Sequence, residues 1–331
     1  MAEGAGGFLP GPFAMPLTYL RNVKDALGWL KPHEVREKAE RRVRVGLFAE
    51  SEVALFRMET FFAPSHWSPQ RRNQAAGILY RGDPDSAERF DVEIWSDQMP
   101  RPREAIAFDW RNPERTVKQV IRRHEDLAVP LARHLEPFRA PAVNQVILKI
   151  SRENALFALA TALPDLVPIL SLPWAAGEFA SDTAVLTANQ IRMAFLLGAA
   201  SNREVGYREQ RNEIGSIIAG AFGWRALARE LVGKIPLGGG IIPKAAIAWA
   251  GTFVVGRSLE RYYRIGYGYT AAERKAAYED ALRRGREIAA GLADAVRGRK
   301  KATGELPSGG GDQPPAAANG LASMPEEPAE N

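Results

Sequence analysis

The sequence predicts a mainly α protein, in which a small N-terminal α/β domain precedes an all-α domain of helical hairpins. Two observations support this prediction. Short runs of β-branched and aromatic residues are confined to residues 42–110, where they alternate with helical patterns. From residue 143 onward the apolar residues recur at helical spacing, and clusters of proline or glycine interrupt them.

The N-terminal half contains the signals of an α/β domain. Residues 1–18 are expected to be flexible, and a helical pattern follows to residue 41, with a charged helix that begins near Pro32. Strands are expected at residues 42–48, 77–80, 90–95 and 105–110. A helix opened by acidic residues should follow the first strand, and another should cover residues 113–135. The predicted α/β domain spans residues 19–138.

A helical hairpin domain is predicted over residues 139–268. Proline removes a backbone donor and clashes with the preceding helical turn, and glycine permits the backbone conformations of tight turns. The expected hairpin turns lie at Pro164, Pro168, Pro173, Gly238, Gly239 and Gly240. One continuous helix through either of these segments is therefore not expected.

The C-terminal region divides into an amphipathic helix and an acidic tail. Residues 269–301 place apolar side chains at helical spacing, and Thr270 with Glu273 forms a capping-box pattern at the start. We expect a surface or partner-binding helix here. Residues 302–331 have five acidic and no basic side chains, so this predicted disordered tail contributes −5. Without it, the formal charge of +5 becomes +10 for residues 1–301, which favours anionic partners.

The apolar stretch from residue 154 to residue 256 raises the question of a membrane. Its interruptions and the arginines between its two apolar parts favour hairpins held on one side of a membrane, with basic and aromatic side chains at the lipid headgroups. The candidate interfacial residues are Arg225, Arg229, Lys244, Trp249, Arg257, Arg261 and Tyr262. The buried helices of a soluble bundle would produce the same apolarity, so this alternative stays open.

Polar side chains enter the apolar stripe of the helix expected after Pro173. The predicted seam consists of Asp182, Thr187, Asn189, Gln190 and Met193. It predicts a hydrogen-bonded surface that docks a second helix, or a proton path if the helix lies in a membrane. A satisfied polar network in a protein core is the commoner use of such residues.

The chain offers no pattern of residues for a known type of catalytic site. The first strand and the residues after it read VGLFAESEVALFR, which lacks the second glycine of a P-loop and the lysine and hydroxyl residue that should follow it, so triphosphate hydrolysis is not predicted. The chain has no cysteine, and its four histidines lack the spacing of a helical metal site. We therefore expect no enzyme activity, no cofactor and no metal.

A family resemblance rests on residues 150–265. This region has a Thr-x-x-Gln-x-x-Met helix at Thr187, Gln190 and Met193, a glycine-rich helix with Arg225, a glycine turn and a small-residue helix ending in ERYY. It resembles a bacterial GTPase-associated, YcjF-like inner-membrane domain of unknown function. The N-terminal domain resembles a degenerate Era-like GTPase module without its P-loop. The resemblance implies membrane association and partnership with GTPase-type proteins.

These observations together predict a noncatalytic, membrane-associated adaptor or regulatory protein on the cytoplasmic side of an anionic membrane, with a GTPase as an expected partner. Two alternatives remain: a soluble α-helical interaction module, which would be cytoplasmic, and a pseudo-GTPase that binds nucleotide weakly. Nucleic acid is not an expected partner, because basic and acidic residues are interleaved and no recognition motif occurs. Homo-oligomer formation is left open.

Overall fold

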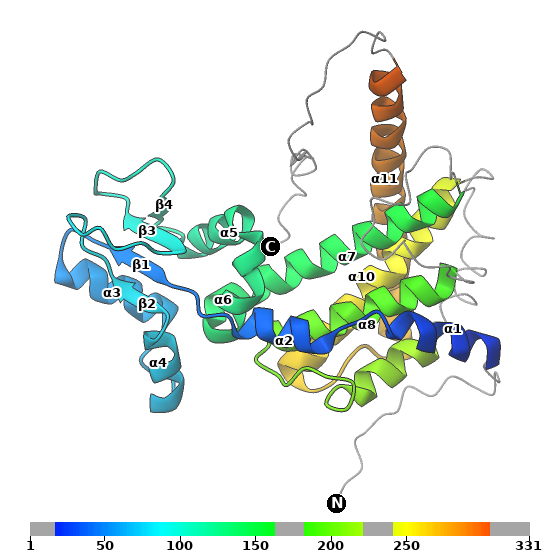
Figure 1. Ribbon diagram of the computed structural model, residues 1–331, viewed down its shortest axis with the longest axis horizontal. Coiled ribbons are helices and arrows are strands. Elements are labelled where there is room, and N and C mark those ends of the chain that lie inside the picture. The colour runs from blue at the N-terminus through cyan, green and yellow to red at the C-terminus, as the bar shows by residue number, and fades with distance from the viewer. Residues whose placement is uncertain (1–16, 163–181, 221–240, 305–331) are drawn as a thin grey trace, which may run out of the picture.

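The computed structural model describes residues 17–162, 182–220 and 241–304. The protein is mainly α with a small parallel α/β part, as the sequence predicts. Figure 1 shows the sheet and its helices at one end of the molecule and the long helices at the other. The predicted flexible N-terminus and acidic tail lie outside the described residues, apart from residues 17–18 and 302–304.

The elements up to residue 138 are short. In chain order they are α1 (Leu17–Leu27), α2 (Pro32–Glu40), β1 (Val45–Phe48), α3 (Glu52–Phe62), α4 (Pro69–Ala76), β2 (Leu79–Arg81), β3 (Val92–Ser96), β4 (Ile106–Phe108), α5 (Pro113–Arg123), η1 (Glu125–Leu127), α6 (Ala128–His134) and η2 (Glu136–Phe138). Ser51 caps α3, because its hydroxyl accepts a hydrogen bond from the Ala54 N–H at 3.2 Å.

The four strands form one sheet in the order β2-β1-β3-β4, and all three pairings are parallel. Each strand lies within or overlaps a predicted strand, but most of the strands are shorter than the sequence runs that predicted them. Alternate residues of β1 and β3, such as Val45, Leu47 and Ile94, point into the main core with the helices. Helices therefore cover this face of the sheet.

The prediction of one helix over residues 113–135 is wrong. α5 ends at Arg123, and a 3-10 turn separates it from α6. Pro130 explains the break, because a proline ring clashes with the carbonyl four residues earlier, here that of Asp126.

Long helices build the rest of the molecule. They are α7 (Arg139–Ala162), α8 (Asp182–Ala200), a helix at residues 211–220, α10 (Ile241–Ile265) and α11 (Ala271–Gly304). α10 packs against α7, α8 and α11. α7 and α8 continue the main core that begins under the sheet, whereas α10 and α11 close a second core around Trp249 and Tyr278.

The first two helices cover the long helices rather than the sheet. α1 and α2 pack mainly against α8, and α2 also contacts α6. Val23 and Ala26 of α1 are buried against Ala184 and Ala188 of α8. The end of α1 is held by Tyr207, whose hydroxyl lies 2.7 Å from the Leu27 carbonyl oxygen.

The turn between α10 and α11 is determined locally. Gly266 adopts a φ of 89°, which favours glycine, and its N–H donates to the Tyr262 carbonyl at 2.8 Å. α11 then begins with the predicted capping box, which is confirmed: the Glu273 carboxylate accepts from the Thr270 N–H at 2.8 Å, and the Thr270 hydroxyl accepts from the Glu273 N–H at 3.3 Å.

The apolar face of α11 is occupied within the chain. Tyr278, Leu282 and Ala289 lie in the second core with Trp249 of α10. The apolar face of α11 therefore packs on α10, which fits a surface helix. Gly285 allows the close approach, because a Cβ atom there would lie 2.9 Å from the Ala246 carbonyl oxygen.

Candidate functional site

The predicted polar seam lies in the interior between α7, α8 and α10. Asn189 donates from Nδ2 to the Asn154 side-chain oxygen at 2.7 Å, and Asn154 donates to the Thr252 hydroxyl at 2.7 Å. Gln190 reaches the same hydroxyl at 3.3 Å, and Thr252 donates to the Ala248 carbonyl at 2.8 Å. Three helices therefore share one buried hydrogen-bonded network, which fits the core alternative that the sequence left open.

The other seam residues have separate roles. The Thr187 hydroxyl donates to the Thr183 carbonyl of its own helix at 2.7 Å. Met193 is fully buried, and its sulfur lies close to Gly256 of α10. Asp182 is the first residue of α8, at the edge of the described residues. Asn189 and Gln190 of the predicted set therefore take part in the network.

Sequence reasoning missed the partners of this network. Asn154 of α7 and Thr252 of α10 are polar residues with mostly apolar neighbours, and both are buried. A second buried cluster also escaped notice: Gln210 Nε2 lies 2.7 Å from both the Ala194 carbonyl and the Tyr263 hydroxyl. Burial raises the pKa of Tyr263, so its hydroxyl remains protonated. An isolated amide within an apolar stripe is the signal that could have found these groups.

A partly buried ion pair joins α7 and α8 beside the network. The Arg192 guanidinium contacts the Glu153 carboxylate. Burial raises the pKa of Glu153 above its ordinary value, while the charge of Arg192 acts in the opposite direction. The pair stabilises a carboxylate that would otherwise be poorly solvated.

Several predicted site residues lie outside the described residues. They are Pro164, Pro168, Pro173, Arg225, Arg229, Gly238, Gly239 and Gly240. The hairpin turns therefore stay a prediction. None of the described helices is long and apolar enough to cross a membrane.

The predicted interfacial residues of α10 do not share one surface. Trp249 is fully buried in the second core, so its assignment to an interface is corrected, and Tyr262 packs against the main core. Lys244 lies near the start of α10 and donates to the Thr161 hydroxyl at 2.9 Å. Arg257 and Arg261 lie near the other end, about 20 Å or more away at ~1.5 Å per residue.

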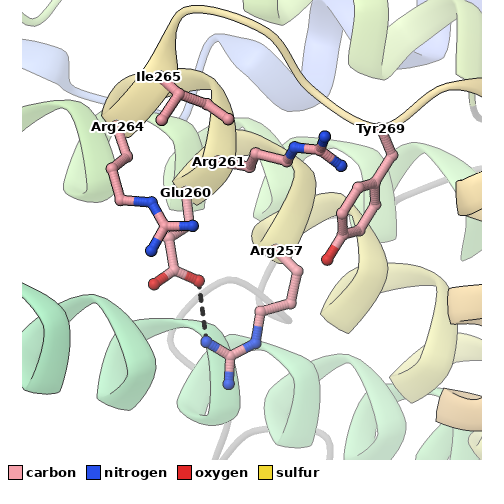
Figure 2. A pocket seen from close by; sticks show the side chains of 6 residues that line it. All are labelled: Arg257, Glu260, Arg261, Arg264, Ile265 and Tyr269. Atoms are coloured by element: carbon pink, nitrogen blue, oxygen red, sulfur yellow. Dashed lines mark hydrogen bonds and ion pairs between the residues drawn. The ribbon is translucent and has the colours of Figure 1, made fainter.

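The C-terminal end of α10 forms the more open basic site. Arg257, Arg261 and Arg264 follow helical spacing, and we call these three residues the arginine face. With Glu260, Ile265 and Tyr269 they line a shallow pocket of about 440 Å³ (Figure 2).

The three arginines differ in how many hydrogen bonds and ion pairs their guanidinium groups form with the rest of the protein. Arg257 extends toward α7 in Figure 2, where it donates to Asn144 at 2.5 Å and to Glu260 at 2.9 Å. Arg261 pairs with Glu273 at 2.7 Å and lies over the Tyr269 ring at 5.5 Å. Arg264 is exposed at the helix end. The site therefore combines two anchored guanidinium groups with the exposed residue Arg264.

Glu273 is the carboxylate most affected by this site. The Arg261 guanidinium, together with the Thr270 backbone and hydroxyl groups, lowers the pKa of Glu273 to about 2. Glu273 therefore stays ionised and neutralises part of the arginine face at all physiological pH values.

A GTPase module binds the phosphates of its nucleotide at the turn after the first strand, and the corresponding turn of this chain lacks the features of such a site. The connection between β1 and α3 is the short turn Ala49–Glu50–Ser51, and the Ser51 hydroxyl is engaged in capping. The Glu50 carboxylate would repel a phosphate at this helix start. Among the residues of known placement, no group of three or more His, Asp or Glu side chains could hold a metal ion.

Comparison of the chain with protein-family models, with curated proteins and with solved structures gave no match.

Proposed function

We propose that this protein is a noncatalytic adaptor that associates peripherally with the cytoplasmic side of an anionic membrane. The single observation that supports it is the arginine face beside the exposed side chains of Ile265 and Tyr267. Basic residues near an anionic membrane surface contribute about 1 kcal/mol each, and adjacent apolar or aromatic side chains can enter the interface. The expected partnership with a GTPase-type protein comes from the family resemblance and belongs to the same proposal.

The packing favours a surface contact over inserted hairpins. The polar groups of α8 that would mark an intramembrane path are bonded to α7 and α10, and Trp249 is buried by α11. The apolar faces of α7, α8 and α10 are thus largely used against one another. The exposed end of α10 offers basic and apolar side chains to lipid headgroups.

Vesicle sedimentation of the full chain tests the proposal. The protein should sediment with vesicles of phosphatidylcholine mixed with phosphatidylserine, and much less with phosphatidylcholine alone. Added salt should weaken the binding, because exposed charges are screened. Recovery of all the protein in the supernatant with anionic vesicles would overturn membrane association.

Paired variants locate the contact. Arg264→Glu combined with Ile265→Ser should reduce sedimentation with anionic vesicles by about tenfold or more, because a cation and an apolar contact are lost together. Arg36→Glu combined with Lys38→Glu on α2 changes charge at exposed positions elsewhere and should have a much smaller effect. Equal losses in the two variants would contradict a specific arginine face.

A second candidate is an interaction module that binds another protein and no membrane. The observation that favours it is the outer surface of α3, where Val53 and Phe56 are 71% and 62% exposed. Retention of a partner by the full chain together with no vesicle binding would favour this candidate. The pseudo-GTPase alternative predicts heat on calorimetric titration with GTP, and we expect none.

A further inference from the structure

The second face of the sheet is covered differently from the first. It carries a small cluster in which Phe48 of β1 stacks on Trp95 of β3, with ring centroids 4.3 Å apart. Phe90 from the loop before β3 and Met99 and Ala105 from the loop between β3 and β4 complete this cluster. The described residues of the cluster belong to strands and loops. All-parallel sheets normally have helices on both faces. In the part of the chain that the structure describes, loops therefore pack on this face, where a helical layer is usual.

A basic pocket opens where this loop layer meets the edge strand β4. Its volume is about 420 Å³, and its lining includes Arg101, Arg103 and Arg123. Met99 and Ala107 contribute apolar surface to the same pocket. Ala107 lies on the Trp95 face of the sheet, since it is the register partner of Trp95.

The arginines of this pocket are mostly available for a ligand. Arg123 donates to the Glu104 backbone carbonyl at 3.2 Å, which positions it without neutralising its charge. Arg101 and Arg103 are exposed, and no ion pair within the described residues holds either of them. They alternate with Pro100 and Pro102, whose rings restrict the backbone of the loop. The positive charge is therefore concentrated and held on a stiffened rim.

The edge of β4 is not free to pair with another strand along its length. The Ala107 carbonyl accepts a hydrogen bond from the Thr116 hydroxyl at 3.2 Å, and the same hydroxyl accepts from the Asp109 N–H at 2.8 Å. A side chain of α5 thus occupies the position that a β-strand ligand would need. Recognition at this pocket must instead use side chains.

We infer that this pocket docks an acidic helical segment of a protein partner. Its carboxylates would pair with Arg101 and Arg103. A planar guanidinium group can donate two parallel hydrogen bonds to one carboxylate. An apolar side chain on the same segment would cover Met99 and Ala107, completing the layer that the sheet lacks on this face. This inference does not depend on membrane binding, because the arginine face belongs to the separate helix α10.

Fluorescence anisotropy with the full chain tests this inference. The probe is a fluorescein-labelled helical peptide of about 16 residues, with glutamates along one face and leucines beside them. Saturable binding is expected. Arg101→Glu combined with Arg103→Glu should weaken it about tenfold or more, while Arg36→Glu with Lys38→Glu serves as the charge-matched control. Unchanged thermal unfolding of the first variant would establish that it still folds.

Three outcomes would overturn the inference. One is an absence of saturable binding, and another is an equal loss in the two charge-reversed variants. The third is that Arg101→Glu with Arg103→Glu abolishes sedimentation with anionic vesicles while leaving peptide binding unchanged, which would assign the pocket to lipid. The variant Arg264→Glu with Ile265→Ser should retain peptide binding, so the failure of the membrane proposal remains distinguishable from failure here.

Discussion

The interior and the C-terminal end of α10 use polar side chains in different ways. In the interior, Thr252 is enclosed between α7 and α8 and takes part in several hydrogen bonds. At the end of the helix, Arg261 pairs with the Glu273 carboxylate, and Arg264 is exposed. We infer that the interior groups chiefly determine stability and that the terminal groups are available for binding.

Replacing Asn154 should have the largest effect, and it tests whether the interior polar groups determine stability. Asn154→Leu should lower the free energy of unfolding by about 2–4 kcal/mol, because Asn189 and the Leu186 carbonyl lose a buried partner. Denaturant unfolding measures this loss. Replacing Asn189 with leucine as well should recover part of it, since both polar partners are then removed. A double variant less stable than Asn154→Leu would show that the network is not acting as one unit.

Breaking the ion pair beside the network should have the next largest effect. Arg192→Met should cost about 1–3 kcal/mol, because it leaves the largely buried Glu153 without its cation. The folded pKa of Glu153 is raised, so the folded state binds the proton more readily than the unfolded chain. The stability of the variant should therefore fall as pH rises from 4.5 through the folded pKa. A pH-independent loss in denaturant unfolding would contradict this account.

Two glycines sharpen the contrast between tight packing and open surface. Gly285→Ala should destabilise the protein by about 1–2 kcal/mol, because the new methyl group meets the Ala246 carbonyl of α10. Gly215→Ala is the matched control, since its Cβ would meet nothing within 4 Å. It should stabilise by about 0.5–1 kcal/mol through helix propensity. Thermal unfolding compares the two, and equal effects would deny the close approach of α10 and α11.

The smallest expected effect concerns Glu273, which lies in the first turn of α11 and pairs with Arg261 of α10. Its folded pKa of about 2 lies below the ordinary 4.5, so its contribution to stability is present above 4.5 and is lost as pH falls through about 2. Glu273→Gln should make the melting temperature less dependent on pH between about 5 and about 2. An identical pH slope in the variant and the parent chain would exclude this pair as a source of acid sensitivity.

The local features were predictable because their causes lie within a few residues of one another. Thr270 and Glu273 are three residues apart, so their capping box follows from the pattern alone. The start of α5 follows in the same way from Pro113, which occupies the first helical position. The end of α5 was missed, since Pro130 was not used to break the pattern.

The candidate sites were less predictable. Gln190 was identified as a polar residue on an apolar face, yet its partner Thr252 lies 62 residues away in the chain. Trp249 was assigned to an interface, because an aromatic residue near arginines has the same sequence pattern whether it is exposed or packed. The burial of Trp249 depends on Tyr278 and Leu282, which the sequence places on a different helix.

The fold class, the approximate positions of the strands, the absence of a P-loop and the opposite net charges of residues 1–301 and 302–331 could all be predicted from the sequence. These properties depend on composition and on short spacings. The tertiary structure decided the strand order, the partners of Asn154 and the exposure of Arg264, and it placed Arg101 and Arg103 at an edge strand. Such properties depend on contacts between distant segments, for which many pairings have the same local pattern and only packing selects one.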